Sequence, residues 1–254
     1  MSFEVAADAY DRFMGRYSSQ LVPQMLELAQ VRPGQSALDV GCGPGALTAG
    51  LVARLGAGAV CAVDPSRPFV AANRQRHPGV DVSEASAEQL PFDDGRFDVT
   101  VAQLVVHFMA DPVVGLSEMR RVVRPGGVVA ACVWDHAGGR SPVADFWRVA
   151  VAIDPAAPTE TDLNGAREGH LAELMRDAGL HEVYDTVLSA EVVYDRFEDW
   201  WQPYTAGVGP AGAYLASLPP SRRNTVRDGC QELLGSRPFT ITGRAWAATG
   251  TRSG

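Results

Sequence analysis

Short apolar segments alternate with amphipathic segments along the first half of the chain. Runs rich in Val, Ala and Leu predict buried strands at residues 36–41, 59–63, 80–85, 97–103 and 128–134. Segments with helical spacing of apolar residues predict helices at 46–55, 66–76 and 112–124. Strands separated by helices pair in parallel and are covered on both faces. The pattern therefore predicts an α/β fold with a Rossmann-like, doubly wound sheet.

Both ends of the chain add elements to this pattern. Before the first strand, residues 7–16 and 18–30 predict two helices. After Trp134, helices are predicted at 141–152 and 168–178, and strands at 184–193 and 239–248. About 45 residues separate these last strands, and they contain Trp200, Trp201, Tyr204 and Tyr214.

Composition narrows the possible partners. The chain has 254 residues, 46% of them apolar, which suits one α/β domain with additional elements. Its formal net charge is −8, and its basic residues form only short pairs such as Arg120-Arg121 and Arg222-Arg223. A nucleic-acid groove needs clustered Lys and Arg. We therefore expect no nucleic-acid partner, and either a monomer or a homodimer.

Cysteine usage and hydropathy predict a cytoplasmic protein. Cys42, Cys61, Cys132 and Cys230 show no CxxC spacing and no zinc-like pairing with His, so we expect reduced thiols and no metal. Residues 1–10 carry Glu4 and Asp8 and no long apolar run, so we expect no secretory signal. The longest apolar stretch, residues 99–110, is too short to cross a bilayer, so no membrane insertion is expected.

A glycine-rich turn follows the first predicted strand. In residues 38–48, Leu-Asp-Val-Gly-Cys-Gly-Pro-Gly-Ala-Leu-Thr, the strand ends, three glycines follow and a helix begins. Glycine has no Cβ, so backbone N–H groups can approach a ligand, and the helix N-terminus adds a partial positive charge. The turn therefore predicts a site for a polar or anionic group at the carboxyl end of the strand.

A carboxylate ends the second predicted strand. Asp64 stands where an acidic residue can accept both hydroxyls of an adenosine ribose; alternatively, it only caps the next helix. The turn also satisfies the dinucleotide pattern G-x-G-x-x-A, so a nicotinamide oxidoreductase stays an alternative. Asp39 argues against it, because a carboxylate beside the turn would repel a pyrophosphate and suits an ammonium group.

The sequence resembles class I S-adenosylmethionine-dependent methyltransferases from about Tyr10 to Trp134, roughly half of the chain. The resemblance rests on residues 38–45, on Ala87-Glu-Gln-Leu-Pro-Phe92, on Phe97-Asp98-Val99 with His107 downstream, and on residues 121–127. The subgroup looks like bacterial quinone-biosynthesis and other small-molecule methyltransferases. It implies S-adenosylmethionine as cofactor and a mostly parallel, seven-stranded sheet with an antiparallel last strand.

The resemblance also implies roles for the residues of the first two turns. The turn of Gly41, Cys42, Gly43 and Gly45 would hold the methionine moiety, with Asp39 near its ammonium group. Asp64 would bind the ribose. Pro65 and Ser66 would lie beside the adenine.

Later motifs imply further contacts with the cofactor. Ala87 and Glu88 would lie along the adenine edge, and Gln103 and Leu104 would face the methionine moiety. Related proteins often place an N-terminal Tyr and Arg over the cofactor, which makes Tyr10 and Arg16 candidates. The family often has Asp before the Ala-Glu pair, where this chain has Ser86; its neutral hydroxyl would bind the adenine amino group more weakly.

These interpretations divide the chain into three parts. Residues 1–34 are predicted to form an N-terminal helical lid, and 35–135 the cofactor-binding core. Residues 136–254 would complete the sheet and carry cap insertions near 141–165 and 195–236.

Methyl transfer from a sulfonium requires that the acceptor be oriented toward the methyl group. If the acceptor must also lose a proton, a base is needed. His107 is the first candidate for this base, with packing against its apolar neighbours as the alternative. His136 and Asp135 come next. The aromatic segment around Trp200, Trp201 and Tyr204 either lines the acceptor pocket or packs a cap helix on the core.

The sequence thus predicts a methyltransferase that acts on a small-molecule acceptor. Two alternatives stay open, an NAD(P)-dependent oxidoreductase and a cofactor-binding protein without transferase activity.

Overall fold

A seven-stranded sheet forms the centre of the computed structural model, which describes residues 7–254. The strand order is β3-β2-β1-β4-β5-β7-β6. The strands are β1 (Ala37–Val40), β2 (Val60–Asp64), β3 (Asp81–Glu84), β4 (Phe97–Gln103), β5 (Val123–Trp134), β6 (His181–Tyr194) and β7 (Phe239–Thr251). Strand β7 runs antiparallel to both its neighbours, β5 and β6, and the other strand pairs are parallel. The predicted Rossmann-like fold with an antiparallel last strand is confirmed.

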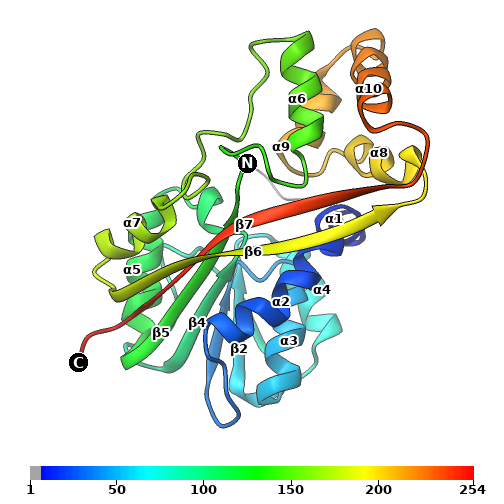
Figure 1. The fold of residues 1–254 in the computed structure, drawn as a ribbon. Helices are drawn as coiled ribbons and strands as arrows, with labels where there is room; N and C mark the ends of the chain where they lie inside the picture. The colour runs from blue at the N-terminus through cyan, green and yellow to red at the C-terminus, as the bar shows by residue number, and fades with distance from the viewer. Residues whose placement is uncertain (1–6) are drawn as a thin grey trace.

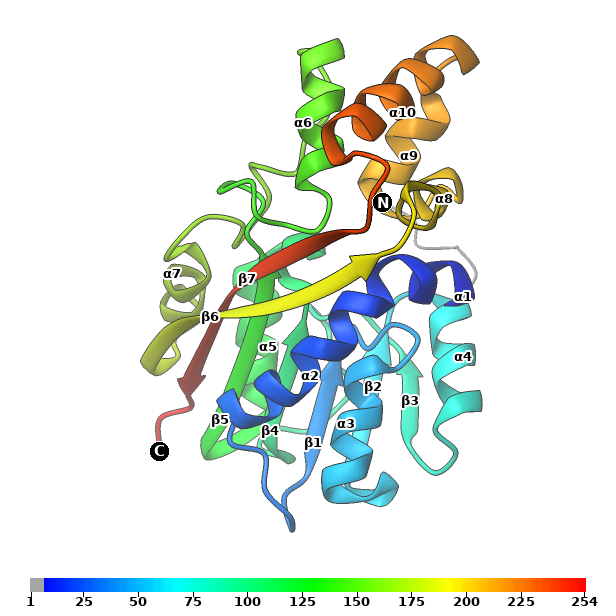
Figure 2. The same cartoon turned by 45° about the vertical axis from the view of Figure 1, so that its right-hand side comes forward.

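Helices cover both faces of this sheet (Figures 1 and 2). One face carries α2 (Arg16–Leu28), α3 (Ala46–Leu55) and α4 (Arg67–Arg76), and the other carries α5 (Pro112–Val122) and α7 (His170–Asp177). Leu21 and Leu51 are fully buried on the first face, as are Leu116 and Met119 on the second. Two short 3₁₀ segments, η2 (Ala57–Ala59) and η3 (Val106–Phe108), connect elements at the ends of strands.

The N-terminal helices differ from the prediction. Instead of two helices with a break near Tyr17, α1 (Ala7–Tyr10), the π-helical segment η1 (Asp11–Gly15) and α2 follow one another without a gap. Tyr17 is buried inside this run, because its ring packs edge-on against Trp134. A π-helical turn shifts the helix face that follows it. The run therefore keeps apolar contacts on both sides of η1.

Residues 125–127, which separate the predicted helix at 112–124 from the predicted strand at 128–134, are part of β5. Phe97 pairs with Val123 and Val99 with Val128, so residues 124–127 bulge out of the ladder. A Cβ on Gly127 would lie 2.8 Å from the carbonyl oxygen of Asp98, closer than real contacts allow. The bulge therefore requires glycine where the two strands approach closely.

The cap consists of helices beyond one end of the sheet (Figure 1). It contains α6 (Ala144–Ile153), α8 (Phe197–Thr205), α9 (Gly209–Ser217) and α10 (Pro220–Leu234). Helix α10 packs against α6 and α8, so the two predicted insertions meet in space. The three-part domain division itself stays a prediction.

Side chains from α2 cover part of the free edge of the sheet, at β6. The Gln20 amide donates to the Glu191 carbonyl at 2.7 Å and accepts from its N–H at 3.1 Å. Gln24 makes the same pair of bonds with Ser189, at 2.8 and 3.3 Å. Each amide thus bonds β6 as a neighbouring peptide group would.

No helix in residues 7–254 combines the length and the apolar character that spanning a bilayer requires.

Candidate functional site

Asp39 lies beneath the glycine-rich turn, near the end of β1. It is 1% exposed, and its Oδ2 accepts a hydrogen bond of 2.6 Å from Thr48 Oγ1, on α3. Thr48 in turn accepts from Asn73 Nδ2, on α4, at 2.9 Å. Burial raises the pKa of Asp39 to about 7, despite the bond from Thr48. This carboxyl group therefore lies close to a change of charge at neutral pH.

The turn itself needs glycine for two different reasons. Gly41 has φ +68°, and a Cβ there would clash with the side chain of Val105. Gly43 has φ +52°, and a Cβ there would meet no protein atom within 4 Å. The backbone at Gly41 is therefore packed against the protein, whereas Gly43 faces open space, into which a ligand can approach its backbone.

Asp64, at the end of β2, holds this turn in place. Its Oδ2 accepts from the N–H of Gly43 and its Oδ1 from the N–H of Ser66, both at 2.8 Å. Burial raises the pKa of Asp64, and the two backbone bonds oppose that rise. The second bond fixes Ser66, the residue just before α4, and does not reach an N–H of the helix itself.

These residues border a hollow that we call the glycine cleft. Two adjoining cavities of about 490 and 350 Å³ form it, and they share Tyr10, Gly41, Gly43 and Gln103. The other predicted residues that line it are Asp39, Cys42, Asp64, Pro65 and Leu104. The sequence did not single out Phe69, Val105 and Phe108, which also line it.

Two residues at the end of β4 have unusual conformations or bonding. Gln103 is buried; its Nε2 donates to the Ser18 carbonyl at 3.0 Å, and its Oε1 has no partner in the described residues. Leu104 has φ +64°, which is rare for a residue with a Cβ. Such backbone strain often occurs at binding sites. Gln103 Oε1 thus remains available to a donor group in the cleft.

The remaining predicted residues lie elsewhere. Gly45 precedes α3, and Ser66 contacts the site through its bond to Asp64. Ser86 is exposed, Ala87 is buried in the core, and Glu88 Oε1 accepts from the N–H of Ala110 at 2.7 Å. Neither cavity of the cleft has these three residues in its lining.

Arg16 also lies away from the cleft. Its guanidinium lies over the ring of Tyr194, 5.2 Å from the centroid, and it lines a different surface groove. Tyr10, in contrast, lines the cleft, and its ring packs edge-on against Phe69 at 5.4 Å. Ion pairs from Arg76 to Asp11 at 2.7 Å and to Asp8 at 3.3 Å hold this end of the helical run against α4.

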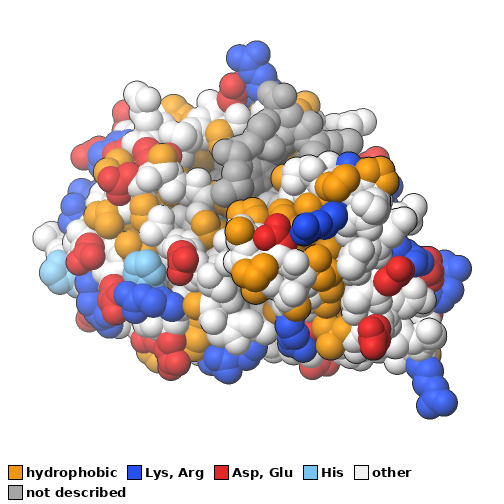
Figure 3. Space-filling model, turned by 90° about the horizontal axis from the view of Figure 1, so that it is seen from above, with side chains coloured by type: hydrophobic (Ala, Val, Ile, Leu, Met, Phe, Trp, Pro, Cys, Tyr) orange, Lys and Arg blue, Asp and Glu red, His pale blue; other side chains and the backbone are white. Residues whose placement is uncertain are grey.

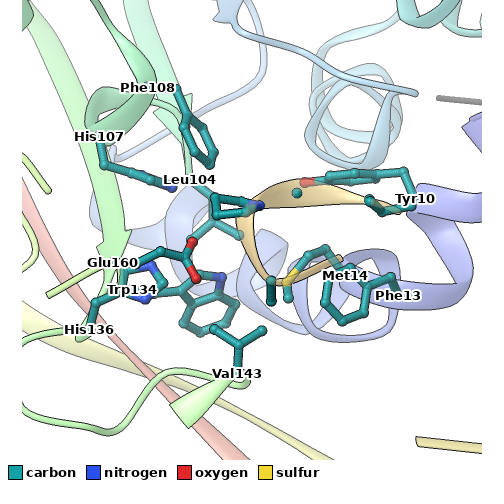
Figure 4. Close-up of a pocket in the computed structure, with 14 residues that line it drawn as sticks. Tyr10, Phe13, Met14, Leu104, His107, Phe108, Trp134, His136, Val143 and Glu160 are labelled. Carbon is teal, nitrogen blue, oxygen red and sulfur yellow. The ribbon is translucent and has the colours of Figure 1, made fainter. Parts of the chain in front are cut away.

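A separate cavity of about 470 Å³, the apolar hollow, adjoins the cleft. The two share Tyr10, Leu104 and Phe108. Its other lining residues are Phe13, Met14, His107, Trp134, His136, Val143, Glu160, Val208, Gly209, Pro210 and Ala211. Figure 4 shows His107, His136 and Glu160 on one side of it, and Tyr10, Phe13 and Met14 across from them.

The aromatic segment of the cap packs against its neighbours. Trp200, Trp201 and Tyr204 are buried, and the Tyr204 ring stacks on Phe146 with centroids 4.8 Å apart. None of the three lines the apolar hollow. The geometry therefore favours the packing interpretation over the pocket interpretation for this segment.

Comparison with known proteins agrees with this architecture. Residues 38–131 match the family described as methyltransferase domain. Residues 38–131 thus carry a class I methyltransferase domain. Over 131 residues it is 35% identical to a malonyl-[acyl-carrier protein] O-methyltransferase of Pseudescherichia vulneris, covering 51% of this chain and 50% of that one. A demethylmenaquinone methyltransferase of Lysinibacillus sphaericus is 32% identical over 135 residues, covering 50% and 58%.

A solved structure shows the same fold as this chain. It is a phosphoethanolamine N-methyltransferase of Haemonchus contortus, in complex with S-adenosylhomocysteine, with a TM-score of 0.61 and 16% identity. The match covers 97% of this chain and 57% of that one. The chain spans about half the length of the curated relatives that it matches. The comparisons give no support to the oxidoreductase or to the protein without transferase activity.

The glycine cleft fits the cofactor that the family implies, S-adenosylmethionine. Gly43 borders space that a Cβ would enter, and Gln103 Oε1, which no residue in 7–254 bonds, is an acceptor for an ammonium group. Asp39 and Asp64 supply carboxylates on either side. In residues 7–254, no group of three or more His, Cys, Asp or Glu side chains is arranged to hold a metal ion.

Proposed function

We propose that the protein transfers the methyl group of S-adenosylmethionine to a small-molecule acceptor. One observation carries this proposal: the glycine cleft opens next to an apolar hollow, and Tyr10, Leu104 and Phe108 form the boundary between them. A donor in the glycine cleft and an acceptor in the apolar hollow would therefore meet at this boundary. Methyl transfer requires such proximity and the exclusion of water.

The cleft residues would hold the methyl donor by charge and hydrogen bonding. Asp39 and Gln103 Oε1 would bind the ammonium group of the methionine moiety, and Asp64 the ribose hydroxyls. Bound there, S-adenosylmethionine supplies a methyl group that its sulfonium already activates. Tyr10 covers the boundary and excludes water from it. His107 would take up a proton from an acceptor that loses one.

The proposal includes a small acceptor and no nucleic acid. The net charge is −8, and on the face shown in Figure 3 the Arg side chains lie apart, among Asp and Glu. We propose further that the protein works in the cytoplasm, as a monomer or a homodimer. All four cysteines are buried and unpaired, which suits a reducing compartment.

Calorimetry with S-adenosylhomocysteine, the product of the methyl donor, tests the donor site. Gly43→Ala adds a methyl group to the open space of the cleft, so affinity is expected to fall about tenfold, equivalent to about 1.4 kcal/mol. Gly34→Ala is the matched control, because Gly34 also has a positive φ and open space around its Cβ but lies in a remote turn. Binding of NADH, or no binding of S-adenosylhomocysteine, would contradict the proposal.

A further inference from the structure

Three polar side chains are buried at one side of the apolar hollow. His107 belongs to η3, His136 follows β5, and Glu160 lies in the loop between α6 and α7. They are only 5%, 6% and 6% exposed. Figure 4 shows these three side chains gathered on the same wall, although they come from separate segments of the chain. The otherwise apolar hollow therefore has one polar side.

Three ring nitrogens of the two histidines lack a hydrogen-bond partner in the part of the chain that the structure describes. Nδ1 of His107 and both ring nitrogens of His136 are buried without a hydrogen-bond partner in the described residues. Buried polar groups in proteins nearly always have a partner, because an unmade bond costs free energy. A neutral imidazole offers one donor and one acceptor. The hollow thus presents unused donors and acceptors to a ligand.

Burial controls the charge of this wall. It lowers the pKa of His136 to about 4 and that of His107 well below the usual value, with each histidine neutral near pH 7 as a result. Burial raises the pKa of Glu160 to about 7, while Trp147 Nε1 donates to its Oε2 at 2.6 Å. Among the described residues, this bond reaches only Oε2 of the two carboxyl oxygens.

The lining restricts what the wall can recognise. Its described residues include no Lys or Arg, so a carboxylate or phosphate on the acceptor would find no cation there. A permanently charged group of either sign would also lose its hydration in an apolar cavity. A hydroxyl group is uncharged, and it both donates and accepts one hydrogen bond. It therefore matches neutral imidazoles and a carboxyl group.

We propose that His107, His136 and Glu160 form the acceptor-recognition site, and that the acceptor is a compact apolar molecule with a phenolic hydroxyl. This inference rests on the proposed function, since it assigns the substrate class of the same site. A flat aromatic body would fill the space between the polar wall and the apolar side chains opposite it, Phe13 and Met14.

The reaction balances within the two cavities. The phenolic oxygen forms a bond to the methyl carbon, and the carbon–sulfur bond breaks, leaving its electron pair on sulfur. The phenolic proton passes to a ring nitrogen of His107. One positive charge thus moves from sulfur to the imidazole ring, and no further reactant is required.

Paired probes test this recognition. The probes are 4-isopropylphenol with 4-isopropylfluorobenzene, and 4-phenylphenol with 4-fluorobiphenyl. In each pair, fluorine replaces the hydroxyl group at nearly the same size. Titrations followed by ligand NMR are run on the protein alone and on the protein saturated with S-adenosylhomocysteine. We expect at least one phenol to bind about tenfold more tightly than its fluoro partner, since the polar wall is then satisfied.

Variants locate the preference on the polar wall. His107→Phe and His136→Phe keep a ring but remove its nitrogens, and each is expected to reduce the phenol preference about fivefold or more. Glu160→Gln still accepts from Trp147 but replaces the other oxygen with an amide, and a reduction of about threefold is expected. His181→Phe and Glu168→Leu, at exposed positions, are the matched controls.

The role of His107 in proton transfer has a separate readout. In His107→Phe, methylation of the preferred phenol, measured by mass spectrometry, is expected to fall about a hundredfold, the scale of a lost general base. Its affinity for S-adenosylhomocysteine is expected to stay within about twofold, because His107 does not line the glycine cleft.

The outcomes separate the two proposals. No binding of S-adenosylhomocysteine, with a phenol preference that the variants remove, would overturn the methyltransferase proposal alone. Normal binding of S-adenosylhomocysteine without a phenol preference in either pair would overturn the acceptor class. A preference that survives in His107→Phe and His136→Phe would remove the polar wall from recognition.

Discussion

The glycine cleft and the apolar hollow share a boundary but are built in different ways. The cleft depends largely on backbone geometry in two short segments at the ends of β1 and β2, which contain Gly41, Gly43 and Asp64. The hollow depends on side chains that come from the N-terminal run, from β4 and β5, and from the cap. Cleft variants should therefore change donor affinity, and hollow variants should change acceptor selection.

The largest expected effect tests the backbone of the cleft. Gly41→Ala combines a positive φ with a clash against Val105, so the free energy of unfolding is expected to fall by about 3 kcal/mol. Adding Val105→Ala should recover part of this loss, because the clash is relieved while the φ strain remains. Urea denaturation of the three proteins measures both effects; no recovery would mean that φ strain alone sets the cost.

The next effect concerns Asp64, which holds the turn and faces the cleft. Asp64→Ala is expected to weaken S-adenosylhomocysteine binding by about 1–3 kcal/mol, the scale of a lost charged hydrogen bond. Stability should fall as well, because the N–H groups of Gly43 and Ser66 lose their acceptor. Asp81→Ala, on the exposed start of β3, serves as control. Unchanged affinity in a folded variant would leave Asp64 with a structural role only.

A variant beside the apolar hollow should lower the stability of the protein without changing its affinity for the donor. Trp147→Phe removes the hydrogen bond to Glu160, and leaves a buried carboxyl group less well paired. The free energy of unfolding is expected to fall by about 1–2 kcal/mol, while affinity for S-adenosylhomocysteine stays unchanged. Calorimetry measures the affinity, and thermal unfolding measures the stability. A parallel loss of cofactor affinity would show that the two cavities are not independent.

The pH dependence of donor binding follows from Asp39. Its pKa lies at about 7 in the free protein, and only the ionised carboxylate pairs well with an ammonium group. Affinity for S-adenosylhomocysteine should therefore fall as pH decreases below about 7, by at most about tenfold per pH unit. Calorimetry between about pH 8 and about pH 5 measures this slope. Asp39→Asn should bind more weakly and without this slope; an unchanged slope would assign it to another group.

The smallest expected effect lies outside both cavities. Replacing Gln20 and Gln24 with Ala removes four bonds to the backbone of β6. These bonds are exposed, so a loss of only about 1 kcal/mol in unfolding free energy is expected. Chemical denaturation tests this value. A large loss of donor affinity would instead show that these glutamines position Tyr10.

The contrast between the glycine cleft and the apolar hollow also explains which site residues the sequence could predict. Alternating apolar segments determined the sheet, and Asp39, Gly41 and Asp64 lie at strand ends that the pattern itself locates. Glu160 gave no signal, because it lies in an irregular loop and reaches the hollow only through tertiary packing. Ser86 and Arg16 were inferred from a family pattern, and the structure places both outside the two cavities.

Other differences have local physical causes. The predicted break near Tyr17 is absent because a π-helical turn lets the helix continue while changing its buried face. Residues 125–127 belong to β5, since a bulge can absorb glycines without ending a strand. From the sequence, the aromatic residues of α8 could line a pocket. In the structure they are buried, and the ring of Tyr204 stacks on Phe146 of α6.

The two glutamines on α2 have a consequence for self-association. An uncovered outer strand offers its peptide groups to any other chain and so invites fibre growth or swapped dimers. At Ser189 and Glu191 those groups are already engaged by side chains of the same molecule. Addition of a strand from another molecule is thus blocked at this point of β6. The helical run that lines the cleft and the hollow therefore also protects the protein against aggregation.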